Sequence, residues 1–209
     1  GLGDSVRFNA AMAAAKPVIE VQFFSPGGVL GEGIKIGRSI RSMGLATRVA
    51  DGAWCLSACN FMFLGGVVRT VEPRGKFGVH MFSNDQAELL ARDMETLPTS
   101  VDEFNDRYPK HQLKRYEVAK FIEQENAKNP SAGMNERNFF SRPDMRRTMI
   151  DERVRDIQQS SAEVAAVISL YLVEMKLSLR FLLEFSGQTS YGMAYLSAEQ
   201  LRSYNVVTN

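Results

Sequence analysis

Ser57 is the residue whose type and position point most directly to chemistry. It lies in Trp54-Cys55-Leu56-Ser57-Ala58-Cys59, where a predicted strand turns into a predicted helix. A serine at such a turn is similar to a nucleophile elbow, in which a sharp turn projects Oγ outward and directs the next backbone N–H into the same space. The flanking glycines of that motif are missing. A serine that caps the helix predicted over Asn60–Leu64 is therefore the competing interpretation.

A second candidate motif is Ser25-Pro26-Gly27-Gly28, which follows one predicted strand and precedes a predicted helix. A glycine pair in this place can present free backbone N–H groups to an anion. The same four residues also suit a simple turn between a strand and a helix. The motif indicates an anion-binding turn only if other groups able to act on a substrate lie near it.

His80 lies near the end of a strand predicted over Phe77–Met81 and is one of two histidines, with His111. An imidazole titrates near neutrality, as a general base must, although a lone histidine is more often structural. A four-ligand zinc site would need both histidines and both cysteines of the chain. We therefore expect no metal and no cofactor.

Cys55 and Cys59 flank Ser57 and admit three interpretations. They could be small buried hydrophobic residues, or they could form a disulfide that braces the turn of an exported protein. In the third interpretation, one of the two thiols is the nucleophile and His80 is its base. A disulfide requires that the two Cα atoms come within about 7 Å of each other. The spacing alone leaves these alternatives open.

The first eighty residues alternate between strand and helix patterns, which predicts a parallel α/β sheet. The apolar positions Ile36, Ile40 and Met43 recur at helical spacing after Val29. The predicted strands are Val18–Phe24, Leu45–Val49, Ala53–Leu56, Val67–Val71 and Phe77–Met81.

The pattern changes after Phe82. Residues 83–157 are polar, contain several prolines and predict a mostly helical insertion that serves as a lid, an arm or an oligomerisation element. Helical periodicity returns after Asp144, and Ser197-Ala198-Glu199-Gln200 is a capping box that begins a last short helix. We expect residues 1–82 and 158–209 to form the core domain.

Charge and hydropathy exclude some classes of function. The chain has 25 Lys and Arg against 24 Asp and Glu, a net charge of +1, which argues against a broad nucleic-acid-binding surface. The longest strongly apolar run, Val164–Val173, is about half the length that a membrane-spanning helix needs. Membrane association would require a segment outside this sequence.

Ser25-Pro26-Gly27-Gly28, Ser57 in a turn of small residues and Gly78-Val79-His80 together resemble the proteolytic subunit of Clp protease. Gly28 precedes Ser57 by 29 residues and Ser57 precedes His80 by 23, spacings close to the family pattern. The closer likeness is to exported bacterial Clp-like proteins with a Cys-x-Ser-Ala-Cys turn. It covers residues 5–82 and resumes over 158–207, where Tyr195-Leu196-Ser197-Ala198-Glu199 is similar to the family's Phe-Leu-Ser-Ala segment.

This resemblance implies a ClpP/crotonase-like α/β fold with a repeated ββα core and a serine endopeptidase activity on peptides or proteins. Ser57 would be the nucleophile and His80 the general base, with the backbone N–H groups of Gly28 and Ala58 as the oxyanion hole. Gly27 would contact substrate. The resemblance also implies a homo-oligomer in the periplasm or otherwise exported.

The chain departs from the family where the acidic triad member is expected, because residues 186–194 contain no carboxylate. Either the pair suffices, or Thr189 or Ser190 orients His80, or the insertion supplies an acid such as Asp144 or Asp151. Two other functions compete: a catalytically degenerate Clp fold that binds peptides without cutting them, and an acyl-CoA enzyme of the crotonase fold.

Overall fold

The computed structural model describes residues 1–15, 17–81, 92, 95–187 and 192–208. The chain divides into two compact units. The first comprises Gly1–Ser83 and Ala165–Asn209, and the second comprises Asn84–Val164. One helix, α8 (Pro143–Glu174), contributes residues to both units.

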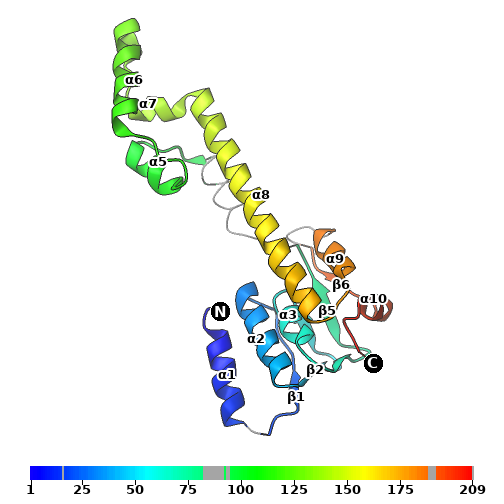
Figure 1. Ribbon diagram of the computed structural model, residues 1–209. Helices are drawn as coiled ribbons and strands as arrows, with labels where there is room; N and C mark the ends of the chain where they lie inside the picture. The colour runs from blue at the N-terminus through cyan, green and yellow to red at the C-terminus, as the bar shows by residue number, and fades with distance from the viewer. Residues whose placement is uncertain (16, 82–91, 93–94, 188–191, 209) are drawn as a thin grey trace. The chain divides into compact units, whose positions relative to one another are not determined.

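The first unit is built on two small sheets of three strands each, among the described residues (Figure 1). In one sheet all strands are parallel, in the order β1-β2-β4; in the other, of order β3-β5-β6, β3 and β5 are parallel and β6 is antiparallel to β5. The strands are β1 (Glu20–Gln22), β2 (Ala46–Val49), β3 (Trp54–Leu56), β4 (Arg69–Val71), β5 (Lys76–Val79) and β6 (Ala194–Tyr195).

The chain passes from one sheet to the other at Ser25. Phe23 N donates to Arg48 O on β2 at 2.9 Å, and Ser25 N donates to Trp54 O on β3 at 3.0 Å. Leu56 N in turn donates to Ser25 O, so the segment after β1 pairs in parallel with β3. This switch brings the Ser25–Gly28 turn beside the end of β3.

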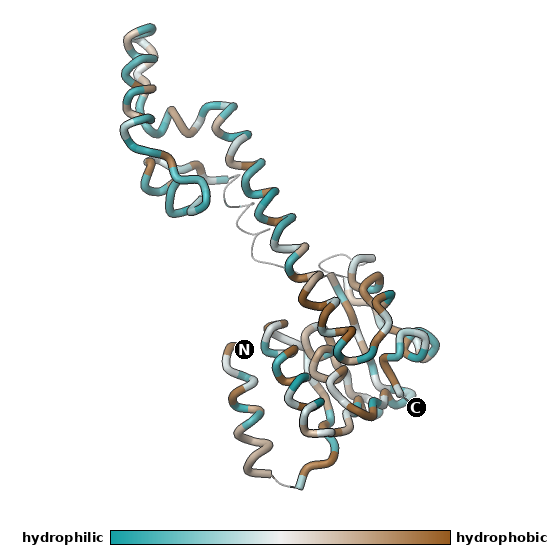
Figure 2. Tube along the Cα trace, viewed as in Figure 1, coloured by the Kyte–Doolittle hydropathy of each residue, from teal (hydrophilic) through white to brown (hydrophobic). Residues whose placement is uncertain are grey.

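The helices of the first unit lie where the apolar periodicity predicts them, except for an N-terminal helix that the sequence pattern did not predict. Hydrophobic residues concentrate on the strands and the last turns of α8 (Figure 2). The helices are α1 (Asp4–Ala14), α2 (Leu30–Ser42), α3 (Cys59–Leu64), the end of α8, η2 (Leu179–Phe181), α9 (Leu182–Ser186) and α10 (Ala198–Ser203). The capping box at Ser197 and Gln200 is present at the start of α10.

Helices α2 and α3 approach each other through glycine. A Cβ on Gly33 would lie 2.5 Å from the carbonyl oxygen of Ala58, so this position leaves no room for a side chain. Tyr171 of α8, fully buried, donates to the carbonyl oxygen of Phe61 at 2.5 Å. These contacts hold α3, and with it the end of β3, against the helical layer.

Two buried charged side chains anchor the N-terminal helix and the C-terminal segment of this unit. Glu32 on α2 accepts from Ser5 N, near the start of α1, and from Lys35 Nζ, each at 2.8 Å. The hydrogen bonds from Lys35 and Ser5 lower the pKa of Glu32 to about 2. Arg69 donates to the carbonyl oxygens of Gly66, Asn205 and Val206 and thereby anchors the C-terminal segment to β4.

The second unit is helical in its described part and has a hydrophobic core of its own, which its polar composition did not predict. Ser100 and Asn135 cap two of its helices, through hydrogen bonds from Glu103 N and Asn138 N. Its helices are α5 (Val101–Arg107), α6 (Arg115–Lys128), η1 (Pro130–Ala132), α7 (Glu136–Ser141) and the first part of α8. The core consists of Val101, Phe104, Tyr108, Val118, Phe139, Phe140 and Met149.

No helix among the described residues is long and apolar enough to span a bilayer. The strand order does not confirm the more detailed expectation of a repeated ββα unit.

Candidate active site

Ser57 occupies a strained turn between β3 and α3. Its φ is +56°, in the left-handed region that costs a residue with a Cβ about 1–2 kcal/mol. The two other described non-glycine residues with positive φ, Lys176 and Asn205, follow the ends of helices, where that conformation is common. Ser57 instead precedes a helix, as the serine of a nucleophile elbow does.

A disulfide bond joins Cys55 and Cys59 across this turn, with a Cα–Cα distance of 5.3 Å. Of the three interpretations of these cysteines, the structure has the disulfide, and neither sulfur is a free thiol. Both residues are completely buried. Because the bond joins β3 to the first residue of α3, it restricts the backbone conformations open to Ser57.

Gly27 packs directly on the Ser57 turn. Its φ is +103°, and a Cβ at this position would lie 2.6 Å from Leu56 O, 2.8 Å from Ser57 Cβ and 2.9 Å from Ala58 N. No residue with a side chain fits without moving this backbone. Gly27 therefore lies beside the serine in space, although it is 30 positions away in the sequence.

The backbone N–H groups of Gly28 and Ala58 donate to no other residue within the described part of the chain. Gly28 has a φ of +149°, and Ala58 immediately follows Ser57. Ala58 is buried, where an unpaired backbone donor is uncommon in folded proteins. An oxyanion hole requires two free donors of this kind directed at the same oxygen.

His80 directly follows β5, and β5 pairs in parallel with β3. Leu56 is opposite Gly78 in this register, and Ser57 N donates to Gly78 O at 3.1 Å. Because the carboxyl ends of parallel strands meet at one edge of a sheet, Ser57 and His80 emerge side by side. Ser57 Oγ makes no hydrogen bond to His80, or to any other described residue.

The imidazole of His80 is oriented by a main-chain carbonyl. Its Nδ1 lies 2.6 Å from Met81 O. A carbonyl oxygen only accepts hydrogen bonds, so this contact requires a proton on Nδ1, and in the neutral tautomer with that proton the lone pair is on Nε2. This is the tautomer that a general base needs.

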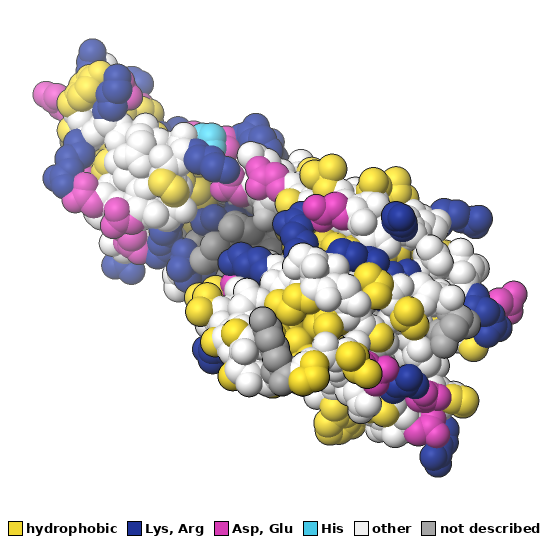
Figure 3. Space-filling view, turned by 60° about the horizontal axis from the view of Figure 1, so that its bottom comes forward, with side chains coloured by type: hydrophobic (Ala, Val, Ile, Leu, Met, Phe, Trp, Pro, Cys, Tyr) yellow, Lys and Arg dark blue, Asp and Glu magenta, His cyan; other side chains and the backbone are white. Residues whose placement is uncertain are grey.

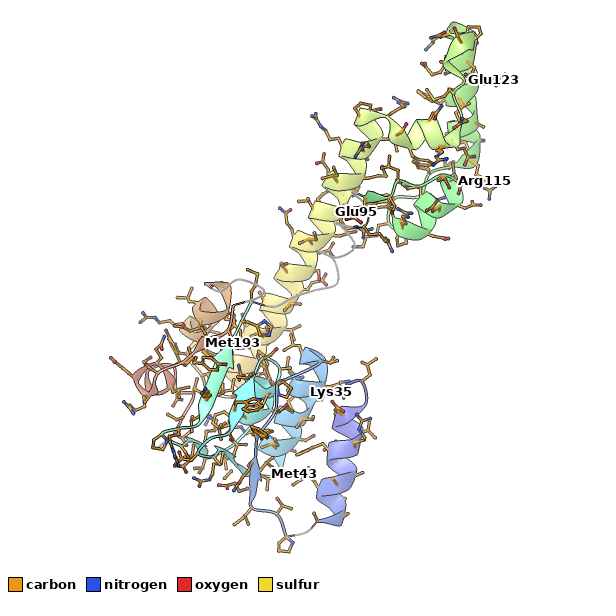
Figure 4. All side chains as sticks on the ribbon, turned by 180° about the vertical axis from the view of Figure 1, so that it is seen from behind. Lys35, Met43, Glu95, Arg115, Glu123 and Met193 are labelled. Atoms are coloured by element: carbon orange, nitrogen blue, oxygen red, sulfur yellow. A yellow bond between two sulfur atoms is a disulfide. The ribbon has the colours of Figure 1, made fainter. Side chains whose placement is uncertain are left out.

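No carboxylate contacts His80 among the described residues. In the antiparallel β5–β6 register Val79 is opposite Ala194, and Met193 lies close to Gly78 (Figure 4). Thr189 and Ser190, which are one of the three alternatives for orienting the ring, lie outside the described residues. Asp144 and Asp151 belong to the second unit, where Asp144 pairs with Arg142.

Metal ligation and a cavity in the second unit are two further features of the described chain to compare with this site. No group of three or more His, Cys, Asp or Glu side chains within it is arranged to hold a metal ion. A cavity of about 580 Å³ lies in the second unit, but its lining mixes basic and acidic side chains, among them the ion pair Lys110–Asp156 at 2.9 Å. Side chains that neutralise one another in this way leave little charge for a ligand.

No protein-family model matches the chain, and no curated protein sequence matches it. Among solved structures, the fold is similar to that of a ClpP1 mutant from Listeria monocytogenes, with 12% sequence identity and a TM-score of 0.41. The match covers 97% of this chain and 78% of the other. A likeness with a TM-score this low carries no argument about this chain, and the candidate site rests on the geometry of the described residues between 25 and 81.

Sequence reasoning missed two groups that touch this site. One is the Met81 carbonyl, which contacts His80 through a main-chain atom that no motif can signal. The other is Asn60, whose side chain reaches β5. An asparagine in an apolar run, Asn60-Phe61-Met62-Phe63-Leu64, is a weak signal that a polar group is buried.

Proposed function

We propose that this protein is a serine hydrolase that cleaves peptide bonds, with Ser57 as nucleophile and His80 as general base. The observation that carries the proposal is the strained Ser57 turn at the end of β3, adjacent to β5, the strand that His80 directly follows. Strain of this kind persists only where the surrounding structure imposes it, and it concentrates at functional sites.

In the proposed reaction, Ser57 Oγ attacks the peptide carbonyl while His80 Nε2 takes the hydroxyl proton. The Gly28 and Ala58 N–H groups stabilise the negative charge that develops on the carbonyl oxygen. His80 returns its proton to the leaving amine, which leaves an acyl-enzyme on Ser57. Water, deprotonated by the same imidazole, then hydrolyses the ester and frees the serine.

The Met81 carbonyl fixes the histidine tautomer but bears no full charge. An aspartate in its place would stabilise the imidazolium that forms during attack, and replacing such an aspartate by its amide costs about 10⁴ in turnover. We therefore expect slow hydrolysis. The same feature favours a second candidate function, a Clp-like fold that binds peptides without cutting them.

A fluorophosphonate probe, which reacts only with an activated serine, tests the proposal. We expect Ser57→Ala to abolish labelling and peptide hydrolysis while the protein stays folded, and His80→Ala to reduce both strongly. Ser203→Ala, in α10, is the matched control and should label like the parent. Labelling of Ser57→Ala at the parental rate would refute the proposal; peptide binding without any labelling would favour the second function.

We also propose that the protein works in an oxidising compartment, such as the periplasm, and self-associates. The Cys55–Cys59 disulfide supports the oxidising compartment, because disulfides persist in exported proteins.

Exposed hydrophobic side chains support self-association (Figure 3). In the first unit Val167, Leu170 and Val173 leave 47%, 67% and 61% of their surface exposed on one side of α8. Light scattering on the parent and Leu170→Glu tests self-association.

A further inference from the structure

Asn60 is a buried polar residue next to the Ser57 turn, and the proposed reaction gives it no role. It lies in the first turn of α3 and is completely buried. Its Nδ2 donates to the carbonyl oxygen of Gly78 at 2.8 Å. Its Oδ1 has no hydrogen-bond partner among the residues that the structure describes.

The unpaired oxygen shows where the benefit of this side chain must lie. Burying an amide oxygen without a partner is unfavourable, and an apolar side chain of similar size would avoid that cost. The stabilising contribution of Asn60 therefore comes from Nδ2 and its bond to Gly78.

That bond joins the two halves of the proposed site. Gly78 O accepts from Asn60 Nδ2 and also from Ser57 N, and Gly78 lies two positions before His80. Asn60 N donates to Ser57 O at 2.9 Å. One residue thus contacts both the turn that carries the nucleophile and the strand that carries the base.

We infer that Asn60 is a positioning residue that holds the Ser57 turn in register with the His80 strand. This inference rests on the proposed serine-hydrolase function. The disulfide cannot do the same, because Cys55 and Cys59 belong to one segment and tie the turn only to itself. Asn60 ties it to its neighbour.

Two substitutions separate this role from a general contribution to folding. Asn60→Leu keeps the size but removes the donor, and we expect the rate of fluorophosphonate labelling per folded molecule to fall about 10- to 100-fold at every pH, since a displacement near 1 Å can cost 10²-fold. Asn60→Asp replaces the donor with a carboxyl group that donates to Gly78 O only while protonated. Burial raises the pKa of such a carboxyl. The labelling rate of Asn60→Asp, relative to that of the parent, should therefore decrease as the pH rises and the carboxyl loses its proton.

Thr47→Val is the matched control. Thr47 on β2 is equally buried, and its Oγ1 donates at 2.8 Å to the carbonyl oxygen of Phe63, near the other end of α3. This variant removes the same kind of buried bond from the same helix. We expect a lower stability and a parental labelling rate.

The outcomes distinguish the two ideas. A parent that labels at Ser57, with Asn60→Leu at the parental rate or Asn60→Asp with the parental pH profile, would overturn the positioning role and leave the hydrolase proposal intact. A parent that does not label at all would refute the hydrolase proposal and this inference with it. Slow labelling of Asn60→Leu beside normal labelling of Thr47→Val supports the inference.

Discussion

Close contacts between backbone segments distinguish the interior of the first unit from that of the second, although aromatic rings pack against one another in both. In the first unit, backbone segments touch at Gly27 and Gly33, where a Cβ would overlap the main chain of the Ser57 turn. The Cys55–Cys59 disulfide closes that turn. In the second unit, the described helices meet through aromatic rings, with Phe104 stacked on Tyr108 at 4.8 Å and on Phe140 at 5.4 Å. Close backbone contact fixes atoms to within fractions of an ångström, as a catalytic site requires.

The largest effect on this comparison should come from removing the centre of the aromatic core. Phe140 is completely buried, so we expect Phe140→Ala to destabilise the second unit by about 3–5 kcal/mol. Hydrogen exchange should accelerate across residues 97–160, while labelling of Ser57 stays at the parental rate. Tyr116→Ala, at an exposed aromatic residue of the same unit, is the control. Loss of Ser57 labelling in Phe140→Ala would show that the candidate site depends on the second unit.

The next prediction compares one glycine from each unit. Gly27 and Gly133 both have positive φ, but only Gly27 faces backbone within 3 Å of an added Cβ; Gly133 has nothing within 4 Å. Gly133→Ala should cost about 1–2 kcal/mol, the cost of the conformation alone. Gly27→Ala adds a steric overlap that typically costs about 1–3 kcal/mol more, and it displaces the Ser57 turn.

Chemical unfolding measures the stability of both glycine variants, and the fluorophosphonate rate reports on the site. We expect the labelling rate to fall about tenfold or more in Gly27→Ala and to stay at the parental value in Gly133→Ala. Equal effects of the two substitutions on labelling would mean that the Gly27 contact does not position Ser57.

Removing the disulfide should cost less stability than either Phe140→Ala or Gly27→Ala. Its loop is very short, so the double variant Cys55→Ala/Cys59→Ala should lose only about 2 kcal/mol, less than the ~3 kcal/mol of a 15-residue loop. We expect slower Ser57 labelling because the turn relaxes. Since both cysteines are buried, dithiothreitol should leave the folded parent unchanged and act only after unfolding. A double variant with parental stability and labelling would contradict the bracing role.

Most of the first unit could be predicted from local sequence patterns. The strand at Leu45–Val49, the helix after Val29 and the capping box at Ser197 all occur close to their predicted bounds. The strand expected over Val18–Phe24 is regular only over Glu20–Gln22, because the chain leaves β2 to pair with β3 at Ser25. Where a strand changes partner is a tertiary property that hydrophobic alternation does not encode.

The hydrophobic core of the second unit could not be predicted from local sequence patterns. The helices of that unit could be predicted in part. The aromatic residues Phe104, Tyr108, Phe139 and Phe140 stand in two short segments of a polar stretch. Each segment by itself is too short to show a helical apolar face over several turns, so periodicity gives little warning that they meet.

The sequence by itself determined the candidate chemical groups: a serine in a small-residue turn, a glycine pair after a strand, and one histidine at a strand end. Residue types and turn propensities are local, and they are legible without a fold. Only the tertiary structure decided that Gly27 packs on the Ser57 turn, that Cys55 and Cys59 are joined, and that the Met81 carbonyl orients His80. These depend on strand register and on main-chain atoms that every residue shares, so side-chain identity cannot reveal them.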